Sequence, residues 1–201
     1  MVELTQVKTI KVVAALLLLS AITQPIYTAL FLGAPDVDSR QALWGLEGLV
    51  FVFLAAFAGS ALVMAKRYTL GFSAIAFSAV LNLVQIGVGY NLFKPFGEAA
   101  RANAELGAVS FSVVLFGFFI YNAAKILLGM AAVVFGMATS NQGRKALGRI
   151  TTIVGAVAIV ANAIVLMLGI AGAFPSPIAG GSGVAATLLL AICLLSLNTD
   201  D

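Results

Sequence analysis

Residues 118–138 read FFIYNAAKILLGMAAVVFGMA, an apolar stretch that holds one charged residue, Lys125. Its length matches the roughly 20 apolar residues that an α-helix needs to cross a bilayer. A charged side chain inside a membrane costs at least about 2.5 kcal/mol on insertion scales, and such residues nearly always face a bundle interior or a polar cavity. The stretch therefore predicts one helix of a transmembrane bundle.

The composition of the whole chain fits such a bundle. Its 201 residues are 62% hydrophobic and only 9% charged, which is too little charge to solvate a water-soluble fold of this size. The regions between the apolar windows are too short to form a second domain. We predict an all-α, polytopic helical bundle that forms a single integral membrane domain over residues 1–201. About six spans are expected, near residues 12–32, 42–65, 68–92, 118–138, 150–173 and 184–197.

Basic residues indicate the orientation of the spans. With six spans the two termini share one side, and most of the lysines and arginines fall on that side: Lys8, Lys11, Lys66, Arg67, Arg144, Lys145 and Arg149. The positive-inside rule then predicts a cytoplasmic (inner) membrane protein with both termini in the cytoplasm. Because basic loops account for the net charge of +3, no nucleic-acid partner is expected.

The cysteine and histidine content argues against most catalytic chemistry. The chain has one cysteine, Cys193, and no histidine. Haem, zinc and copper sites that rely on imidazole are therefore not available within the chain, and neither is the most common general base. We expect no cofactor and no metal site, and an enzyme is the least favoured class.

Two segments leave their boundaries open. Residues 108–138 are apolar for about 31 residues, or roughly 46 Å as straight helix, which is long for one upright span. Either this segment tilts or protrudes, or residues 108–117 lie at the membrane interface, and the second arrangement is the one expected. The polar segment 96–107 before it is expected to form a short surface helix. The last span is short unless it begins near Ile178.

Polar residues within the spans define the candidate site. Glu47 and Lys125 each precede the first basic residue of the next cytoplasmic loop by about 19 positions, so similar depths are expected. We predict an ion pair between them that lines a polar cavity. The cavity residues are expected to be Glu47, Lys125, Tyr121, Asn122, Asn82 and Gln85, with Asn162 as a further candidate.

Simpler roles compete with this cavity. Asn82, Gln85 and Asn162 are also typical of side chains that hold membrane helices together by hydrogen bonds. Lys125 is long enough to extend its ammonium toward the membrane surface, and Glu47 lies near enough to a span end to sit at that surface.

A weak internal repeat accompanies these residues. Spans two and three resemble spans four and five at an offset of about 78 residues, which places Glu47 on Lys125 and, within a residue or two, Asn82 on Asn162. Both hairpins enter from the same side, so the repeat would be parallel, as in some transporters. Chance similarity between apolar helices, which share a span-loop-span composition, is the favoured explanation of the pattern.

Two classes of function remain open from the sequence. The bundle either binds or translocates a small solute or ion through the polar cavity, or it is a non-catalytic accessory subunit or lipid-associated scaffold of a larger membrane complex. The first is slightly favoured because buried charge is costly to maintain. Expected partners are membrane lipids and either further copies of the chain or other membrane subunits.

Overall fold

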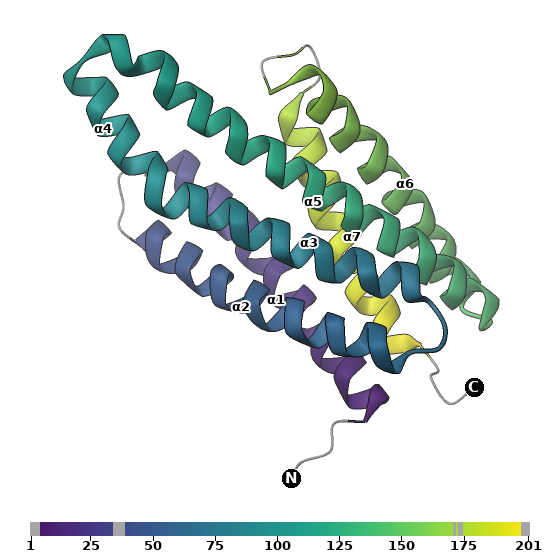
Figure 1. Ribbon diagram of the computed structural model, residues 1–201. Coiled ribbons are helices and arrows are strands. Elements are labelled where there is room, and N and C mark those ends of the chain that lie inside the picture. The colour runs from purple at the N-terminus through teal and green to yellow at the C-terminus, as the bar shows by residue number, and fades with distance from the viewer. Residues whose placement is uncertain (1–4, 34–38, 171, 173–174, 198–201) are drawn as a thin grey trace.

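The computed structural model describes residues 5–33, 39–170, 172 and 175–197, and within them it shows helices and no strand. Residues 89–93 form a π-helical turn, η1 (Gly89–Phe93), and residues 104–106 form a 3₁₀ turn, η2 (Ala104–Leu106). The α-helices are α1 (Gln6–Gly33), α2 (Ser39–Met64), α3 (Thr69–Val88), α4 (Lys94–Ala102), α5 (Gly107–Asn141), α6 (Lys145–Leu168) and α7 (Ser176–Ser196) (Figure 1).

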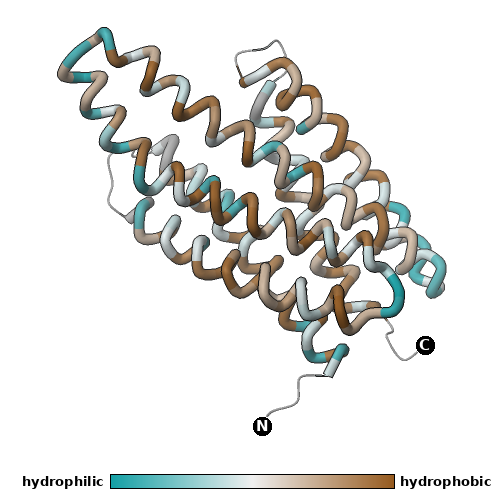
Figure 2. Tube along the Cα trace, viewed as in Figure 1, coloured by the Kyte–Doolittle hydropathy of each residue, from teal (hydrophilic) through white to brown (hydrophobic). Residues whose placement is uncertain are grey.

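Six helical segments in the described residues are long and apolar enough to cross a membrane. Four of them fall within single helices: α1, α2, α6 and α7. The other two are composite, because α3 continues through η1 into α4 and η2 leads directly into α5. Apolar residues dominate the length of the bundle, while hydrophilic residues gather at the turns at its two ends (Figure 2). The predicted all-α bundle with six spans is confirmed.

Five of the helices form a closed ring. Around the ring, α1 packs against α2, α2 against α3, α3 against α5, α5 against α7, and α7 against α1. The remaining span, α6, lies outside the ring against α5 and α7 (Figure 1). Within the described residues α1 and α5 do not pack on each other, so their side chains can meet only across the middle of the ring. This arrangement creates the setting of the candidate site.

The helices α3 to α5 form a hairpin that extends past the neighbouring helices at the end opposite the α2–α3 turn (Figure 1). Helix α5 runs unbroken over 35 residues, about 52 Å at 1.5 Å per residue. A continuous helix cannot place its first ten residues flat on the membrane and then cross it. The expectation that residues 108–117 form a separate segment before the span is therefore wrong, because they are the first part of the same helix. The alternative of a tilted or protruding helix is consistent with this continuous α5.

The third span also continues past its expected end at Lys94 and Pro95. Proline lacks an N–H donor and its ring crowds the preceding helical turn. The chain accommodates this with the wider π-turn of η1, after which Pro95 takes one of the first positions of α4. The side chain of Asn91 donates to the carbonyl of Gly87 at 2.9 Å, which gives the turn an additional hydrogen bond.

The last two spans differ modestly from their expected bounds. Helix α6 begins at Lys145, earlier than expected, and ends before Gly169, whose φ of 76° lies in the left-handed region that favours glycine. Helix α7 begins at Ser176, so the earlier start proposed for the last span is confirmed.

Glycines allow α5 and α6 to approach closely along one seam. A Cβ added at Gly155 would lie 2.8 Å from the carbonyl oxygen of Gly129, and one at Gly136 would lie 2.8 Å from that of Gly148. Each helix thus contributes two glycines seven residues apart, and the pairs face each other in antiparallel order. Small residues at membrane helix interfaces let backbones approach and gain van der Waals contact, which explains how α6 is held outside the ring.

We expect Gly155→Leu to destabilise the protein because the added side chain meets backbone that cannot move independently. Overpacking of this kind typically costs about 1–3 kcal/mol. Gly59→Leu is the matched control, since a Cβ at Gly59 would meet nothing within 4 Å. Thermal unfolding in detergent should show a lower midpoint for Gly155→Leu alone. Equal midpoints for the two variants would contradict the glycine seam.

Candidate functional site

Lys125 lies at the centre of the ring and is fully buried, with 0% of its surface exposed. Its stem crosses the face of α7 where Gly183 has no side chain: a Cβ at that position would lie 2.8 Å from the lysine Cδ. The ammonium donates a hydrogen bond to Oε1 of Gln24 on α1 at 2.6 Å, and its Nζ lies 5.1 Å from the ring centroid of Tyr121. Lys125 therefore points into the bundle and does not reach the membrane surface.

Glu47 approaches the same region from α2 and is only 3% exposed. The hydroxyl of Thr23 lies 2.6 Å from its Oε1. Thr23 and Gln24 are consecutive residues of α1, and they directly precede Pro25, which lies inside the helix. Two opposite charges from different helices are thus held by two adjacent side chains of α1.

The two charges are coupled through α1. In the described part of the chain, the hydrogen bonds of Glu47 and Lys125 go to Thr23 and Gln24, and no ion pair joins the carboxylate to the ammonium. The opposite charges still attract each other electrostatically. The indirect arrangement follows from the ring, because α2 and α5 are separated by α3 on one side and by α1 and α7 on the other.

The two predicted site residues on α3 are Asn82 and Gln85. Asn82 is buried and donates to the carbonyl oxygen of Ser78 at 2.9 Å and to its hydroxyl oxygen at 3.2 Å. The Ser78 hydroxyl in turn donates to the carbonyl oxygen of Ala124 on α5 at 2.9 Å. Asn82 thus supports the contact between α3 and α5. Gln85 is half-buried one turn further along α3.

Asn122 faces a different part of the molecule. It donates to the carbonyl of Phe118 at 2.7 Å and lines a cavity of about 290 Å³ between α5 and α6. The cavity is otherwise apolar, and its remaining lining residues are Leu115, Phe116, Phe118, Phe119, Val165, Leu166, Gly169 and Ile170. The structure therefore separates Asn122 from the charged centre.

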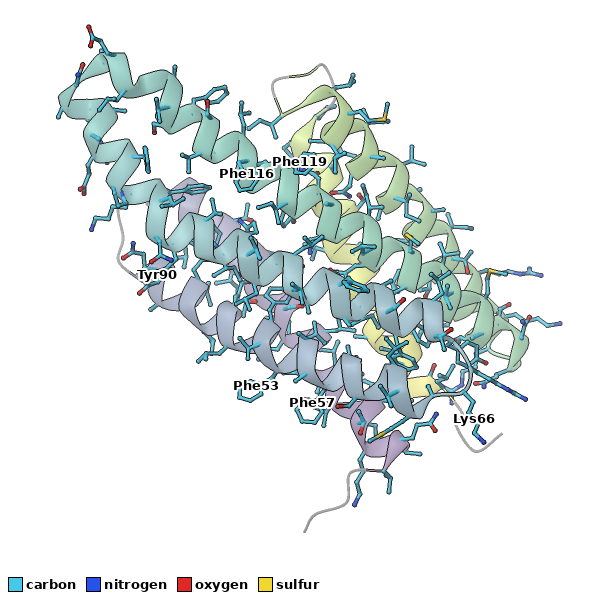
Figure 3. All side chains as sticks on the ribbon, in the orientation of Figure 1. Phe53, Phe57, Lys66, Tyr90, Phe116 and Phe119 are labelled. Carbon is cyan, nitrogen blue, oxygen red and sulfur yellow. The ribbon has the colours of Figure 1, made fainter. Side chains whose placement is uncertain are left out.

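Aromatic side chains also lie on the outside of the bundle. Phe116 and Phe119 lie along α5, and Phe53 and Phe57 project outward from α2 (Figure 3).

Asn162 joins α6 to α7. Its amide donates to the carbonyl oxygens of Ala158 at 2.8 Å and of Ala179 at 3.0 Å. Its own Oδ1 is buried, with no hydrogen-bond partner among the described residues. These contacts match the role of interhelical hydrogen bonding that the sequence offered for this residue.

Three residues at the centre were not among the predicted site residues: Thr23, Gln24 and Gly183. The first two had a signal in the sequence, because they are polar, adjacent and directly before a proline in an otherwise apolar span. Gly183 had none, since its role depends on the path of the Lys125 stem and glycines are frequent throughout this chain.

The fold and the site define an integral membrane protein with six candidate spans and lipid-facing apolar surfaces. No protein-family model, curated protein or solved structure matches the chain. Within the described residues, no three histidine, cysteine, aspartate or glutamate side chains come together as a metal site would require. Function is therefore inferred from the geometry of the charged centre.

We expect Glu47 and Lys125 to be energetically coupled. Removing one member of a buried, oppositely charged set leaves the other uncompensated, which typically costs about 3 kcal/mol or more. Glu47→Gln and Lys125→Met should each lower the free energy of unfolding. The double variant should lose at least about 1 kcal/mol less than the sum of the single losses. Denaturant unfolding in mixed micelles measures all four proteins, and additive losses would contradict the coupling.

We also expect Gly183→Leu to displace the Lys125 side chain. The new side chain would occupy the space of the lysine stem, whereas at Gly181, two residues earlier in α7, a Cβ meets nothing within 4 Å. Gly183→Leu should lower the thermal unfolding midpoint well below that of Gly181→Leu, since displacement breaks the hydrogen bond to Gln24. If the two variants have the same unfolding midpoint, the absence of a side chain at Gly183 is not what makes room for the Lys125 stem.

Proposed function

We propose that the centre of the helix ring binds a small polar solute or ion and takes part in its translocation. The observation that carries this proposal is the unused hydrogen-bonding capacity of two buried charges. An ammonium has three N–H donors, and among the described residues one of them, that to Gln24, has a hydrogen-bond partner. The Glu47 carboxylate has two oxygens, and the described chain supplies one hydrogen bond, from Thr23.

The cost of burying charge favours a functional site over simple packing. Polar side chains that join membrane helices contribute about 0.6 kcal/mol on average, and neutral residues such as Asn82 and Asn162 supply this without burying charge. Ionisable groups within spans are more typical of substrate and ion pathways. Tyr121, beside the ammonium, adds an aromatic surface and a hydroxyl to the same site.

The placement of charged turns supports a cytoplasmic (inner) membrane with both termini in the cytoplasm. The start of α1, the end of α7, the α2–α3 turn and the α5–α6 turn lie at the same end of the bundle (Figure 1). Lys66 marks this end in Figure 3, and Arg144 lies in the α5–α6 turn. The positive-inside rule favours the cytoplasm for this end.

A second candidate function is that of a non-catalytic accessory subunit. It is favoured by one observation, the aromatic outer part of α5, where Phe111, Phe116 and Phe119 are each about half exposed. Such a surface fits lipid or a membrane partner. It does not account for the buried charges, so it ranks second.

Solvent access to the centre tests the solute-binding proposal. Single cysteines at Gln24→Cys and Lys125→Cys, in a Cys193→Ser background, would be treated with charged, membrane-impermeant methanethiosulfonate reagents in membrane vesicles of both orientations. We expect both positions to react, because a solute site must admit water. Ala124→Cys is the matched buried control next to Lys125, and Arg67→Cys in the α2–α3 turn is the exposed control.

If every variant folds and only Arg67→Cys is labelled, water does not reach the centre of the ring. That result would contradict the solute-binding proposal and favour the accessory-subunit function. Labelling of Ala124→Cys to the same extent as Lys125→Cys would show that the bundle opens generally, which would also contradict a defined site.

A further inference from the structure

The hydroxyl of Thr23 makes two contacts that a single proton cannot satisfy together. It lies 2.6 Å from Oε1 of Glu47 and 3.3 Å from the carbonyl oxygen of Ser20. A threonine hydroxyl carries one hydrogen to donate. If Glu47 is ionised, both neighbours are acceptors and only one receives a hydrogen bond. If Glu47 is protonated, its O–H donates to Thr23, which then donates to Ser20, and both contacts are filled.

We infer that Glu47 is a reversible proton-binding site whose hydrogen bond to Thr23 reverses direction when the proton is taken up. One proton from hydronium adds to Oε1 of the carboxylate and leaves a water molecule, and the Thr23 hydroxyl rotates from Glu47 to the Ser20 carbonyl. No other covalent bond changes. The inference rests on the proposed function, since it names the proton as an ion that the centre binds.

Both protonation states are supported by their surroundings. The short distance of 2.6 Å suits a hydroxyl that donates to a carboxylate, because such charge-assisted bonds measure about 2.5–2.7 Å. The carboxyl is only 3% exposed, and burial disfavours its ionised form because a buried charge loses its hydration. The positive charge of Lys125 favours the ionised form. The Thr23 hydroxyl suits both forms of the carboxyl, because it can donate to the ionised form and accept from the protonated form.

The other titratable groups around Glu47 are few. Helix α5 presents Lys125 and Tyr121, which interact electrostatically with the carboxyl. Helix α1 carries Tyr27, whose ring stacks on Trp44 of α2 at 4.8 Å, and η1 carries Tyr90 near the start of α2. The buried residues of α3 are neutral. Among these groups of the described centre Glu47 is the one carboxyl, and the others are a lysine and three tyrosines.

Infrared spectroscopy of the protein in lipid bilayers tests this inference. The C=O stretching band of a protonated carboxyl would be recorded between about pH 5 and pH 9 for the wild type and for Glu47→Gln. We expect a band that is absent in Glu47→Gln, present in the wild type at low pH, lost at high pH and recovered when the pH is returned. A Glu47 band that is absent throughout, or one that persists unchanged throughout, would overturn the inference.

Thr23 provides a second test that leaves Glu47 in place. In Thr23→Val the protonated carboxyl loses its acceptor, so its C=O band should move to higher frequency, whereas Thr23→Ser keeps the hydroxyl and should keep the band position. This pair remains informative if Glu47→Gln fails to fold. An identical band position in both variants would overturn the reversal at Thr23.

The outcomes separate the two proposals. If the thiol reagents label the centre but no Glu47 band changes with pH, proton binding is overturned and solute binding is retained. If the reagents label neither Gln24→Cys nor Lys125→Cys, the proposed function is overturned whatever the infrared result.

Discussion

A polar group that is buried in an apolar helix bundle must form its hydrogen bonds inside the bundle. In this fold the requirement is strongest for Lys125. Its ammonium is fully buried and hydrogen-bonds to Gln24 on a helix that does not pack against its own. The contact is possible because the lysine stem is long and because Gly183 leaves α7 without a side chain along its path. The ring of five helices thus has a polar centre, while α6 packs outside through glycines.

Helix α1 supplies the partners for both charges. Its Thr23 reaches Glu47 on the neighbouring helix α2, and its Gln24 reaches Lys125 on α5 across the ring. Pro25 follows directly, and a proline lacks the N–H that would otherwise bond the carbonyl of Ala21. The hydrogen bonds to both charged groups therefore lie beside a backbone carbonyl of α1 that lacks its usual helical donor.

Much of the fold could be predicted because hydropathy reports directly on what a bilayer accepts. The six spans, the early start of α7 and the ionisable residue in the fourth span all followed from composition and length. The continuous α5 did not, since an apolar run reveals neither tilt nor protrusion.

Within the site, Glu47, Lys125 and Tyr121 were predicted and lie together. Asn122 is only three residues from Lys125, yet it faces the cavity beside α6, because helical spacing gives a shared face and not the identity of the neighbour. The parallel repeat stays a prediction: Asn82 and Asn162 both donate to the carbonyl four residues earlier, but nothing here compares the two hairpins as units.

The contact between Lys125 and Gln24 across the ring is the most direct test of this account. Solid-state NMR on protein in lipid bilayers, labelled with ¹⁵Nζ-lysine and with ¹³Cδ-glutamine, reports this distance through dipolar dephasing. The account predicts strong dephasing of one glutamine signal that disappears in Lys125→Met and in Gln24→Leu. Absence of a close lysine–glutamine pair, or a pair that survives both substitutions, would contradict a centre built around Lys125.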